Sequence, residues 1–287
     1  MTKRIALIIH NQVYAEPELA QLKLPAADTA ALAELLRDPM VGNFDEVELA
    51  VNSPAAELRQ QVAGLFQRKH RHDELLLYIV GYLIVDEAGQ LHLTTVDTHL
   101  DTLAETALSA AYLTDCMDRS FSRRQMLLLD GGCFRLNSIE WAADMHPTTV
   151  FKGRGYGRVV LTSVTGNDST GEEEETSLTH HLVQALQTGA ADADGDGQVE
   201  IKELYEYLRQ QTRQTSLRVY GKHEHFILAR NPYHFIPAQP IKWDLISGAI
   251  LAPVTIIIIG GRADLRTAIG MAGLLLLMYA LLYLAPD

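Results

Sequence analysis

The sequence predicts an α/β fold with a mainly parallel central sheet flanked by helices, followed by two transmembrane helices. Short β-branched and apolar runs alternate along the chain with alanine- and leucine-rich segments whose apolar residues recur at helical spacing. Such alternation is typical of parallel strands with helices on both faces of their sheet. The chain then closes with two long segments that contain no charged residue, and charge-free segments of this length are typical of helices that span a bilayer.

The elements expected in the first half follow from these patterns. Arg4–His10 is a continuous apolar run suited to a strand that is buried on both faces. Further strands are expected at 46–51, 74–80 and 125–129, and a hairpin over 83–94 should turn at 87–90. Helices are expected at 25–37, at 106–117, and from the Ser53-Pro54 pair, which is typical of a helix start, to about Arg68.

The second half continues the alternation of strands and helices. Strands are expected at 158–163 and 225–229, and helices at 176–187 and 200–211. An acidic loop, GEEEE, separates the first of these strands from the first of these helices. Together with the first half, these segments predict one α/β domain over residues 1–235.

Composition excludes several classes of protein. The chain has 287 residues, with 24 Lys and Arg against 36 Asp and Glu, for a net charge of -12. A nucleic-acid-binding protein needs a basic face, so we expect no nucleic-acid partner. Cys116 and Cys133 are the two cysteines, too few for a disulfide framework or a cysteine-rich zinc site. The N-terminus shows no signal-peptide cleavage pattern, which predicts a cytosolic domain.

The charge-free segments are 245–261 and 267–286, joined by the loop RADLR and preceded by a linker over 236–244. Two buried core helices are the alternative, but core helices seldom lack a polar stripe over such a length. We therefore predict a transmembrane hairpin. Arg262 and Arg266 favour a cytosolic loop, whereas a folded domain without a signal is hard to translocate. We expect the soluble domain to face the cytosol from the inner membrane, with a hairpin that inserts conditionally or forms homo-oligomers.

An EF-hand pattern lies in the second half of the chain. The stretch DADGDGQVEIKE places Asp192, Asp194 and Asp196 at loop positions 1, 3 and 5, with Gly197 at the sharp turn of position 6. The remaining ligands would be the backbone carbonyl of Gln198 at position 7 and a bidentate Glu203 at position 12. This pattern predicts Ca²⁺ binding. The alternative is an acidic turn that only caps the following helix, and we find no second loop of the kind with which EF-hands usually pair.

Several stretches, in their order along the chain, resemble the caspase-like cysteine peptidase domains of bacteria over about residues 3 to 232. ALIIHNQVY with LKLPAADTAALAELL resembles the first strand and helix of that family. LLLYIVGYL stands where the family has a strand ending in Ser-Gly-His-Gly, and LLLDGGCF stands where it has Asp-Cys-Cys. The remaining strands and helices of the family are resembled by GRVVLTS, by LTHHLVQALQTGAADADGDGQVEIKELYEYL, which contains the EF-hand pattern, and by FILARNP.

Catalysis in that family requires a cysteine thiolate and a histidine on adjacent strand ends. The resemblance places Tyr82 at the histidine position and Gly132 at the nucleophile position. A phenol with a pKa near ~10 is a poor base, and glycine has no side chain. We therefore predict an inactive site, a pseudo-peptidase. The alternative is an active endopeptidase that uses Cys133, one residue further on, with an unconventional base such as His10, His92 or His99.

One element of the site is retained in the resemblance. In relatives that cleave after basic residues, the aspartate that opens the Asp-Cys-Cys motif helps to form the pocket for that side chain, and Asp130 occupies this position. Asp130 is therefore a candidate for binding Arg or Lys. The alternative is an aspartate that satisfies the backbone amides of a turn.

These observations predict a membrane-anchored, calcium-binding pseudo-peptidase that binds a peptide or protein partner as a scaffold, sensor or effector. The resemblance to bacterial caspase-like domains implies a role in a defence or cell-death module. An active cysteine endopeptidase and a simple membrane-anchored calcium-binding protein remain the competing hypotheses.

Overall fold

The computed structural model describes residues 2–20, 28–135, 146–153, 157–166, 177–212, 215–221 and 226–234. Contacts within the chain divide it into Met1–His234 and Phe235–Asp287. The predicted linker at 236–244 and the predicted hairpin at 245–286 lie outside the described residues. Of the helices in the described ranges, none combines the length and the apolar character needed to cross a membrane.

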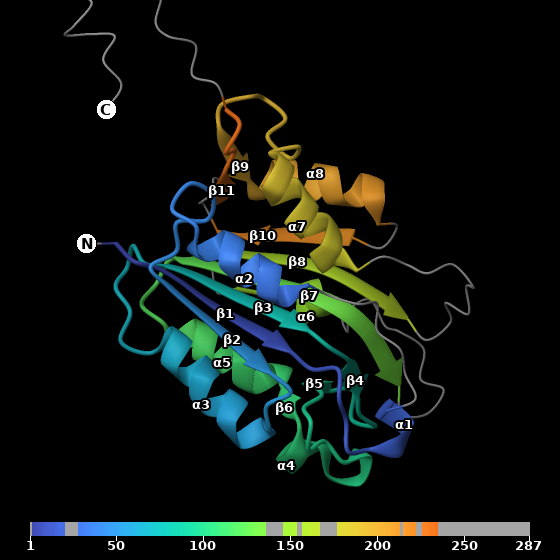
Figure 1. Cartoon of the computed structure of the whole chain (residues 1–287). Helices are drawn as coiled ribbons and strands as arrows, with labels where there is room; N and C mark the ends of the chain where they lie inside the picture. The colour runs from blue at the N-terminus through green and yellow to red at the C-terminus, as the bar shows by residue number, and fades with distance from the viewer. Residues whose placement is uncertain are drawn as a thin grey trace, which may run out of the picture. The chain divides into compact units, whose positions relative to one another are not determined.

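A large mixed sheet forms the centre of the described domain (Figure 1). One run of neighbouring strands has the order β2-β1-β3-β7-β4-β5-β6, while β8 pairs with β7 and β10 pairs with β8. The bounds are β1 Arg4–His10, β2 Glu46–Val51, β3 Glu74–Val80, β4 Leu83–Val85, β5 Leu91–Leu93, β6 Leu108–Ser109, β7 Arg124–Arg135, β8 Arg158–Gly166 and β10 Thr215–Tyr220.

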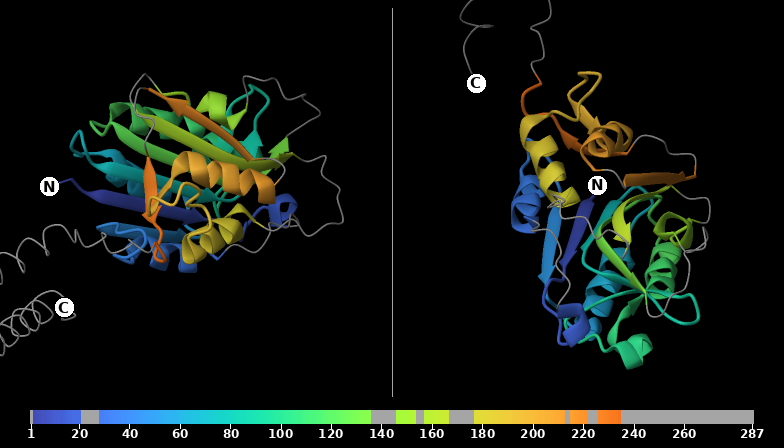
Figure 2. Two further views of the ribbon diagram at one scale, coloured as in Figure 1. Left: turned by 90° about the horizontal axis from the view of Figure 1, so that it is seen from above. Right: turned by 90° about the vertical axis from the view of Figure 1, so that its right-hand side faces the viewer.

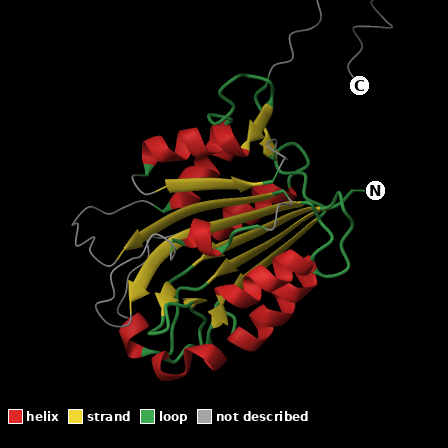
Figure 3. Ribbon diagram, turned by 180° about the vertical axis from the view of Figure 1, so that it is seen from behind, coloured by secondary structure: helices red, strands yellow, loops and turns green. Residues whose placement is uncertain are grey.

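The strands β1, β2, β3, β7 and β8 pair in parallel, which confirms the predicted mainly parallel sheet. The apolar side chains of β1, β3, β7 and β8 are buried on both faces of the sheet, as their near-continuous apolar runs in the sequence indicate, whereas β2 at the edge is only partly buried. Figure 3 shows these strands as one twisted surface. A separate two-stranded sheet pairs β9 (Gln198–Glu200) with β11 (Ile227–Arg230).

Helices cover both faces of the large sheet (Figure 2). On one face, α2 (Thr29–Arg37), α7 (Leu178–Thr188) and α8 (Ile201–Gln211) pack on a cluster that includes Ile8, Leu76 and Leu128. On the other face, α3 (Ala55–Phe66) and α5 (Ala110–Arg119) pack on a cluster that includes Leu7, Leu77 and Leu127. The shorter helices are α1 Pro17–Ala20, the 3₁₀ turn η1 Leu100–Thr102, α4 Leu103–Thr106 and α6 Pro147–Val150.

The helix starts follow from capping side chains. Asp28 accepts a hydrogen bond from the Ala31 amide at 2.9 Å, so α2 begins at Thr29; residues 25–27 of the predicted helix lie outside the described residues. Pro54 stands at the start of α3 as expected, but the cap comes from elsewhere. The Ala55 amide donates to Oδ1 of Asp97 at 2.8 Å, a contact 42 residues away in sequence.

Some predicted boundaries were wrong. The helix expected at 106–117 begins at Ala110, because Leu108 and Ser109 form strand β6 against β5. The strand expected at 125–129 continues to Arg135, so that β7 includes Gly131 and Gly132. Strands β6, β9 and β10 and helices α1, α4 and α6 were not predicted. The expected starts at Thr176 and His225 lie outside the described residues, and α7 and β11 begin at Leu178 and Ile227.

Arg4 links the start of the domain to its end. Its Nη2 donates to the carbonyls of Ile227 at 2.7 Å and Leu228 at 3.0 Å, and its Nε donates to Glu74 at 2.8 Å. The guanidinium also lies over the Phe44 ring, 4.3 Å from its centroid. These contacts satisfy a largely buried cation, and they hold the last described strand to the first.

Candidate functional site

The predicted catalytic positions come together where β7 passes from one partner strand to another. Strand β7 pairs first with β3, up to the pair Val80 and Asp130, and then with β4, from the pair Leu83 and Cys133 onward. Gly81 and Tyr82 fill the gap between β3 and β4, opposite Gly131 and Gly132. This junction is the carboxyl end of a parallel strand, where α/β proteins commonly place their ligands.

Gly131 is required by the backbone at this junction. Its φ is +152°, and a Cβ atom built on it would lie 2.0 Å from the carbonyl oxygen of Gly81. The Gly81 amide in turn donates to the Asp130 carbonyl at 3.1 Å. Any side chain at position 131 would therefore push the two backbones apart.

Tyr82 lies directly against Gly132. A Cβ atom on Gly132 would lie 2.6 Å from Cε1 of the Tyr82 ring, so this ring occupies the space that a nucleophile side chain would need. The Tyr82 side chain is buried and its ring is tilted against the Tyr14 ring, with 5.8 Å between the centroids. Thr94 holds the Tyr82 carbonyl through its amide and its hydroxyl, at 3.0 and 2.9 Å.

Burial raises the pKa of Tyr82 well above its usual value, and the neighbouring Tyr14 raises it further. At neutral pH the phenol is thus uncharged and holds its proton. A neutral phenol cannot take a proton from a thiol. The structure therefore brings the two predicted positions into contact, with a protonated phenol at 82 and no side chain at 132.

The alternative nucleophile, Cys133, and one of its candidate bases, His10, lie on strands that are not neighbours. Cys133 lies in β7 with its backbone beside Leu83 and Gly166; the structure does not describe its side chain. His10 ends β1, which strand β3 separates from β7, so about 10 Å lies between those backbones. The His10 ring bonds to the Thr29 hydroxyl at 2.9 Å.

The other two candidate histidines have carboxylate partners. His92 is buried, with Nε2 3.0 Å from Oδ2 of Asp86. His99 is exposed, and its Nδ1 lies 3.7 Å from Oε2 of Glu16. His92 lies on β5, which strand β4 separates from β7.

Asp130 is buried and bonded to the start of helix α7. Its carboxylate accepts hydrogen bonds from the Thr179 amide at 2.9 Å and the Thr179 hydroxyl at 2.7 Å. The Leu178 amide and the Tyr78 hydroxyl each donate to it at 3.3 Å. Burial raises the pKa of Asp130, while these hydrogen bonds oppose that rise. The amides that it satisfies thus belong to a helix start; a role in binding a basic side chain stays a prediction.

The loop at 192–203, which has the EF-hand pattern, brings its first three carboxylates together. Oxygen atoms of Asp192, Asp194 and Asp196 all lie within 4.8 Å of one another. Gly195 and Gly197 have φ values of 72° and 88°, which favour glycine, and they turn the chain around the cluster. Helices α7 and α8 flank the loop, as the EF-hand pattern predicts.

Asp192 holds one oxygen ready for a further partner. Its Oδ2 accepts hydrogen bonds from the Gly197 amide at 3.1 Å and from the side-chain amide of Asn231 at 2.9 Å. Its Oδ1 is buried and has no hydrogen-bond partner among the described residues. A buried, unsatisfied carboxylate oxygen beside two further carboxylates fits a hard cation. Asn231 was not predicted from the sequence, because it is 39 residues away and reaches the loop through tertiary structure.

Glu203 faces loop amides through both of its oxygens. Oε1 accepts from the amides of Ala193 and Asp194 at 2.9 and 3.2 Å, and Oε2 accepts from the Glu200 amide at 3.0 Å. Such contacts suit the alternative of a helix cap. They also place the position-12 carboxylate across the loop, where exchange of its amide partners for a cation would give bidentate ligation.

The loop pairs with a strand from outside any EF-hand. Strand β9 covers loop positions 7 to 9 and pairs antiparallel with β11. In paired EF-hands a second loop supplies this strand; in this chain residues 227–230 take its place. The pairing explains how a single loop is held in shape.

No protein-family model matches the sequence, and no curated protein matches it. Solved structures do match. The structure described as pro-sf-caspase-1 has 12% identity and a TM-score of 0.50, covering 78% of this chain and 94% of its own. Caspase-1 from Spodoptera frugiperda has 14% identity and a TM-score of 0.47, covering 78% and 92%. Protein GSU0716 from Geobacter sulfurreducens has 11% identity and a TM-score of 0.53, covering 80% and 98%. At such identities the likeness concerns the fold alone, and the described part of this chain has a caspase-like α/β fold.

Proposed function

We propose that this protein is a catalytically inactive caspase-like protein that binds Ca²⁺, is anchored in a membrane by its C-terminal hairpin, and binds a peptide or protein partner. The observation that carries the proposal is the contact between Tyr82 and Gly132. The ring of Tyr82 fills the space of a nucleophile side chain, and its raised pKa keeps it protonated. A binding role for the same strand ends requires neither a base nor a thiolate.

Two assays test the absence of catalysis. The intact chain should cleave no reporter peptide that contains Arg or Lys, with or without calcium. Cys133 should react slowly with a thiol-alkylating probe at neutral pH, because position 82, where the resemblance places the base, carries a protonated phenol. Turnover that disappears in Cys133→Ala would instead establish the competing hypothesis of an active endopeptidase.

Restoring a dyad requires both positions to change together. Gly132→Cys alone places a side chain against the Tyr82 ring, so it should lower stability and give no activity. Tyr82→His with Gly132→Cys supplies a base and a nucleophile and removes part of the clash. Weak cleavage by the double variant, absent from each single variant, is the expected result.

Calcium binding is the second part of the proposal, supported by the free Oδ1 of Asp192 within the carboxylate cluster. Calorimetry should give one site per chain. Asp192→Ala and Glu203→Gln should weaken binding strongly, whereas Glu206→Gln, an exposed carboxylate on the same helix α8, serves as the control. Absence of a calcium-dependent change in melting would contradict binding to the folded chain and favour the helix-cap alternative.

The partner separates this proposal from the hypothesis of a simple membrane-anchored calcium-binding protein. The latter needs no protein partner. Co-purification from solubilised membranes, compared between the wild type and a form truncated after residue 244, tests for one. A role in a bacterial defence or cell-death module is part of the proposal through the resemblance alone, and the neighbouring genes would test it.

A further inference from the structure

The outer edge of strand β2 has no neighbouring strand in the described part of the chain. β2 stands first in the strand order and pairs with β1 alone. It contains no proline, no lysine and no bulge, three of the devices that block an edge strand, and its charged residues are Glu46 and Glu48. One backbone group is occupied from outside the sheet, since the Val47 carbonyl accepts a hydrogen bond from Arg37 at 2.8 Å.

The two faces of β2 have different chemistry. Val47 and Leu49 are half-buried against the cluster under α2, and Val51 at the end of the strand is 44% exposed. On the other face Glu46 and Glu48 lie in register with Ile5 and Leu7 of β1. Both glutamates are exposed, although their neighbours on β1 are core residues beneath α3.

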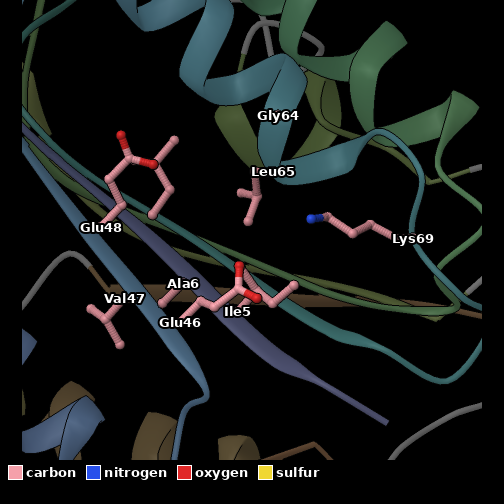
Figure 4. Close-up of a pocket in the computed structure, with 9 residues that line it drawn as sticks. Ile5, Ala6, Glu46, Val47, Glu48, Gly64, Leu65 and Lys69 are labelled. Carbon is pink, nitrogen blue, oxygen red and sulfur yellow. The ribbon is translucent and has the colours of Figure 1, made fainter. Parts of the chain in front are cut away.

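A hollow of about 340 Å³ lies on the glutamate face, between β2 and helix α3 (Figure 4). We call it the β2 groove; Glu46, Glu48, Ile5, Leu7, Gly64 and Lys69 line it. Helix α3 therefore covers β1 and leaves the neighbouring side of β2 uncovered. A side chain from a further strand beside β2 would enter this hollow, because cross-strand neighbours share a face of the sheet.

Gly64 keeps the groove open. It lies inside α3, where a glycine costs about 1 kcal/mol relative to alanine. A Cβ atom on Gly64 would meet nothing within 4 Å, so no packing contact requires a glycine there. The glycine leaves the helix without a side chain at this point of the groove.

Charge favours a basic ligand at Glu48, because Lys69, the cation among the lining residues of the groove, forms no ion pair with Glu48 in the described ranges. Glu46 is paired with Lys3, whose Nζ lies 2.6 Å from Oε1 of Glu46. Glu48 forms no ion pair within the described ranges. A cation from a ligand opposite Glu48 would give this glutamate an ion-pair partner, as Lys3 does for Glu46. The net charge of -12 also attracts basic segments in general. A second copy of β2 is disfavoured in the antiparallel registers centred on Val47 or Glu48, because these set glutamates against glutamates.

We propose that the outer edge of β2 binds an extended protein segment in which apolar side chains alternate with polar ones, one of them a Lys or Arg that faces Glu48. The segment adds a strand to the sheet and displaces Arg37 from the Val47 carbonyl. Its apolar side chains cover Val47, Leu49 and Val51, and its basic side chain lies in the β2 groove. This surface is separate from the strand junction at Tyr82 and from the calcium loop, so it stands or falls independently of both.

The test uses the intact chain and two fluorescent eight-residue peptides in which valine alternates with threonine. One peptide has lysine at a central threonine position and the other has glutamate. Fluorescence anisotropy should show that the lysine peptide binds the wild type. Glu48→Lys should weaken this binding about tenfold, because a favourable pair becomes a repulsive one. The same variant should bind the glutamate peptide better than the wild type does.

Controls separate this site from general attraction to an acidic protein. Glu34→Lys makes the same charge change on the exposed surface of α2 and should leave binding unchanged. Gly64→Leu should weaken binding by filling the groove, and its melting temperature checks that the fold is kept. Hydrogen exchange of the β2 amides should slow when the lysine peptide is bound.

Any of three results would overturn the proposal. These are an equal effect of Glu34→Lys and Glu48→Lys, failure of the charge swap to favour the glutamate peptide, and unchanged exchange of the β2 amides on binding. Failure of the lysine peptide to bind the wild type would overturn it as well. None of these outcomes bears on calcium binding or on peptidase activity.

Discussion

Tyr82 and Gly132 act as a unit, because each defines the space of the other. The Tyr82 ring lies where the Cβ atom of any residue at 132 would lie. The ring itself is held by Tyr14, by the Thr94 contacts to its carbonyl and by burial. A glycine at 132 is thus a packing requirement of this tyrosine, whatever the history of the site.

This coupling is measurable with a double-mutant cycle. Gly132→Ala in the wild type should lower the free energy of unfolding by about 1–3 kcal/mol, because the added methyl group overpacks a buried ring. In a Tyr82→Ala background the same change should cost much less. Chemical denaturation of the four proteins gives the interaction energy, expected in the range of about 0.5–3 kcal/mol. Equal costs in both backgrounds would mean that the ring moves aside freely.

Asp130 should make the stability of the domain depend on pH. Burial raises its pKa in the folded state above that of the unfolded chain. The unfolded chain therefore loses this proton first as pH rises, and the contribution of Asp130 to stability falls through the interval between the two pKa values. The wild type should lose stability relative to Asp130→Asn as pH rises from about 4. A relative gain over that interval would show that the hydrogen bonds from Thr179, Leu178 and Tyr78 outweigh burial.

Asn231 should influence the calcium affinity of the loop at 192–203 without being a ligand. Its side-chain amide holds Oδ2 of Asp192 at 2.9 Å, which leaves Oδ1 free in the cluster. Asn231→Ala removes this contact, so we expect weaker calcium binding by calorimetry, by about tenfold, as for partners of ligands in other metal sites. Asn231→Asp should weaken binding or distort the loop, because it sets two carboxylates against each other. Unchanged affinity in Asn231→Ala would show that the Gly197 amide is sufficient to orient Asp192.

At the scale of single elements, α3 contains a glycine that its own fold does not need. Gly64→Ala should raise the free energy of unfolding by about 0.5–1 kcal/mol, because it adds helix propensity and meets no neighbouring atom. Gly42→Ala is the contrasting control. A Cβ atom at 42 would lie 2.4 Å from the Cα of Leu36, so that change should destabilise the chain. Denaturant unfolding of both variants checks the pair.

The strongest elements were predictable because one kind of pattern dominates each of them. The runs at 4–10 and 74–80 are apolar at almost every position, and the structure buries them between two layers of helices. Strand β10, TSLRVY, lies at an edge with half-exposed side chains, so its apolar content is too low to stand out. Leu108 and Ser109 continue a helical pattern, and pairing with β5 overrides it.

In the candidate site, too, the features set by local sequence were predictable and those set by distant residues were not. Spacing along the chain predicted that Asp192, Asp194 and Asp196 would lie together, because a twelve-residue loop fixes their geometry locally. Contacts over long sequence separations were not predictable. Asn231 reaches Asp192 across 39 residues, and Asp130 reaches Thr179 across 49. Nothing in the local sequence of either partner indicates the other.

At the scale of the whole molecule, we propose that the hairpin at 245–286 anchors the protein as an integral membrane protein. The intact chain should stay in the pellet after extraction of membranes with alkaline carbonate, because two apolar helices partition into the hydrocarbon core. A form truncated after residue 244 should move to the supernatant. Release of the intact chain by carbonate would remove the membrane part of the proposal and leave the described domain unaffected.

The hydrogen bonds from Arg4 to the carbonyls of Ile227 and Leu228 affect when the domain can close during synthesis. The Arg4 guanidinium bonds to carbonyls 223 and 224 residues later in the sequence. A ribosome that has released β1, β2 and β3 can let those strands pair, but Arg4 finds its carbonyl partners only after residue 228 has emerged. Until then the nascent domain carries a largely buried cation whose partners are incomplete. Synthesis of nearly the whole domain must therefore precede its final closure, and the window for chaperone contact lasts until that point.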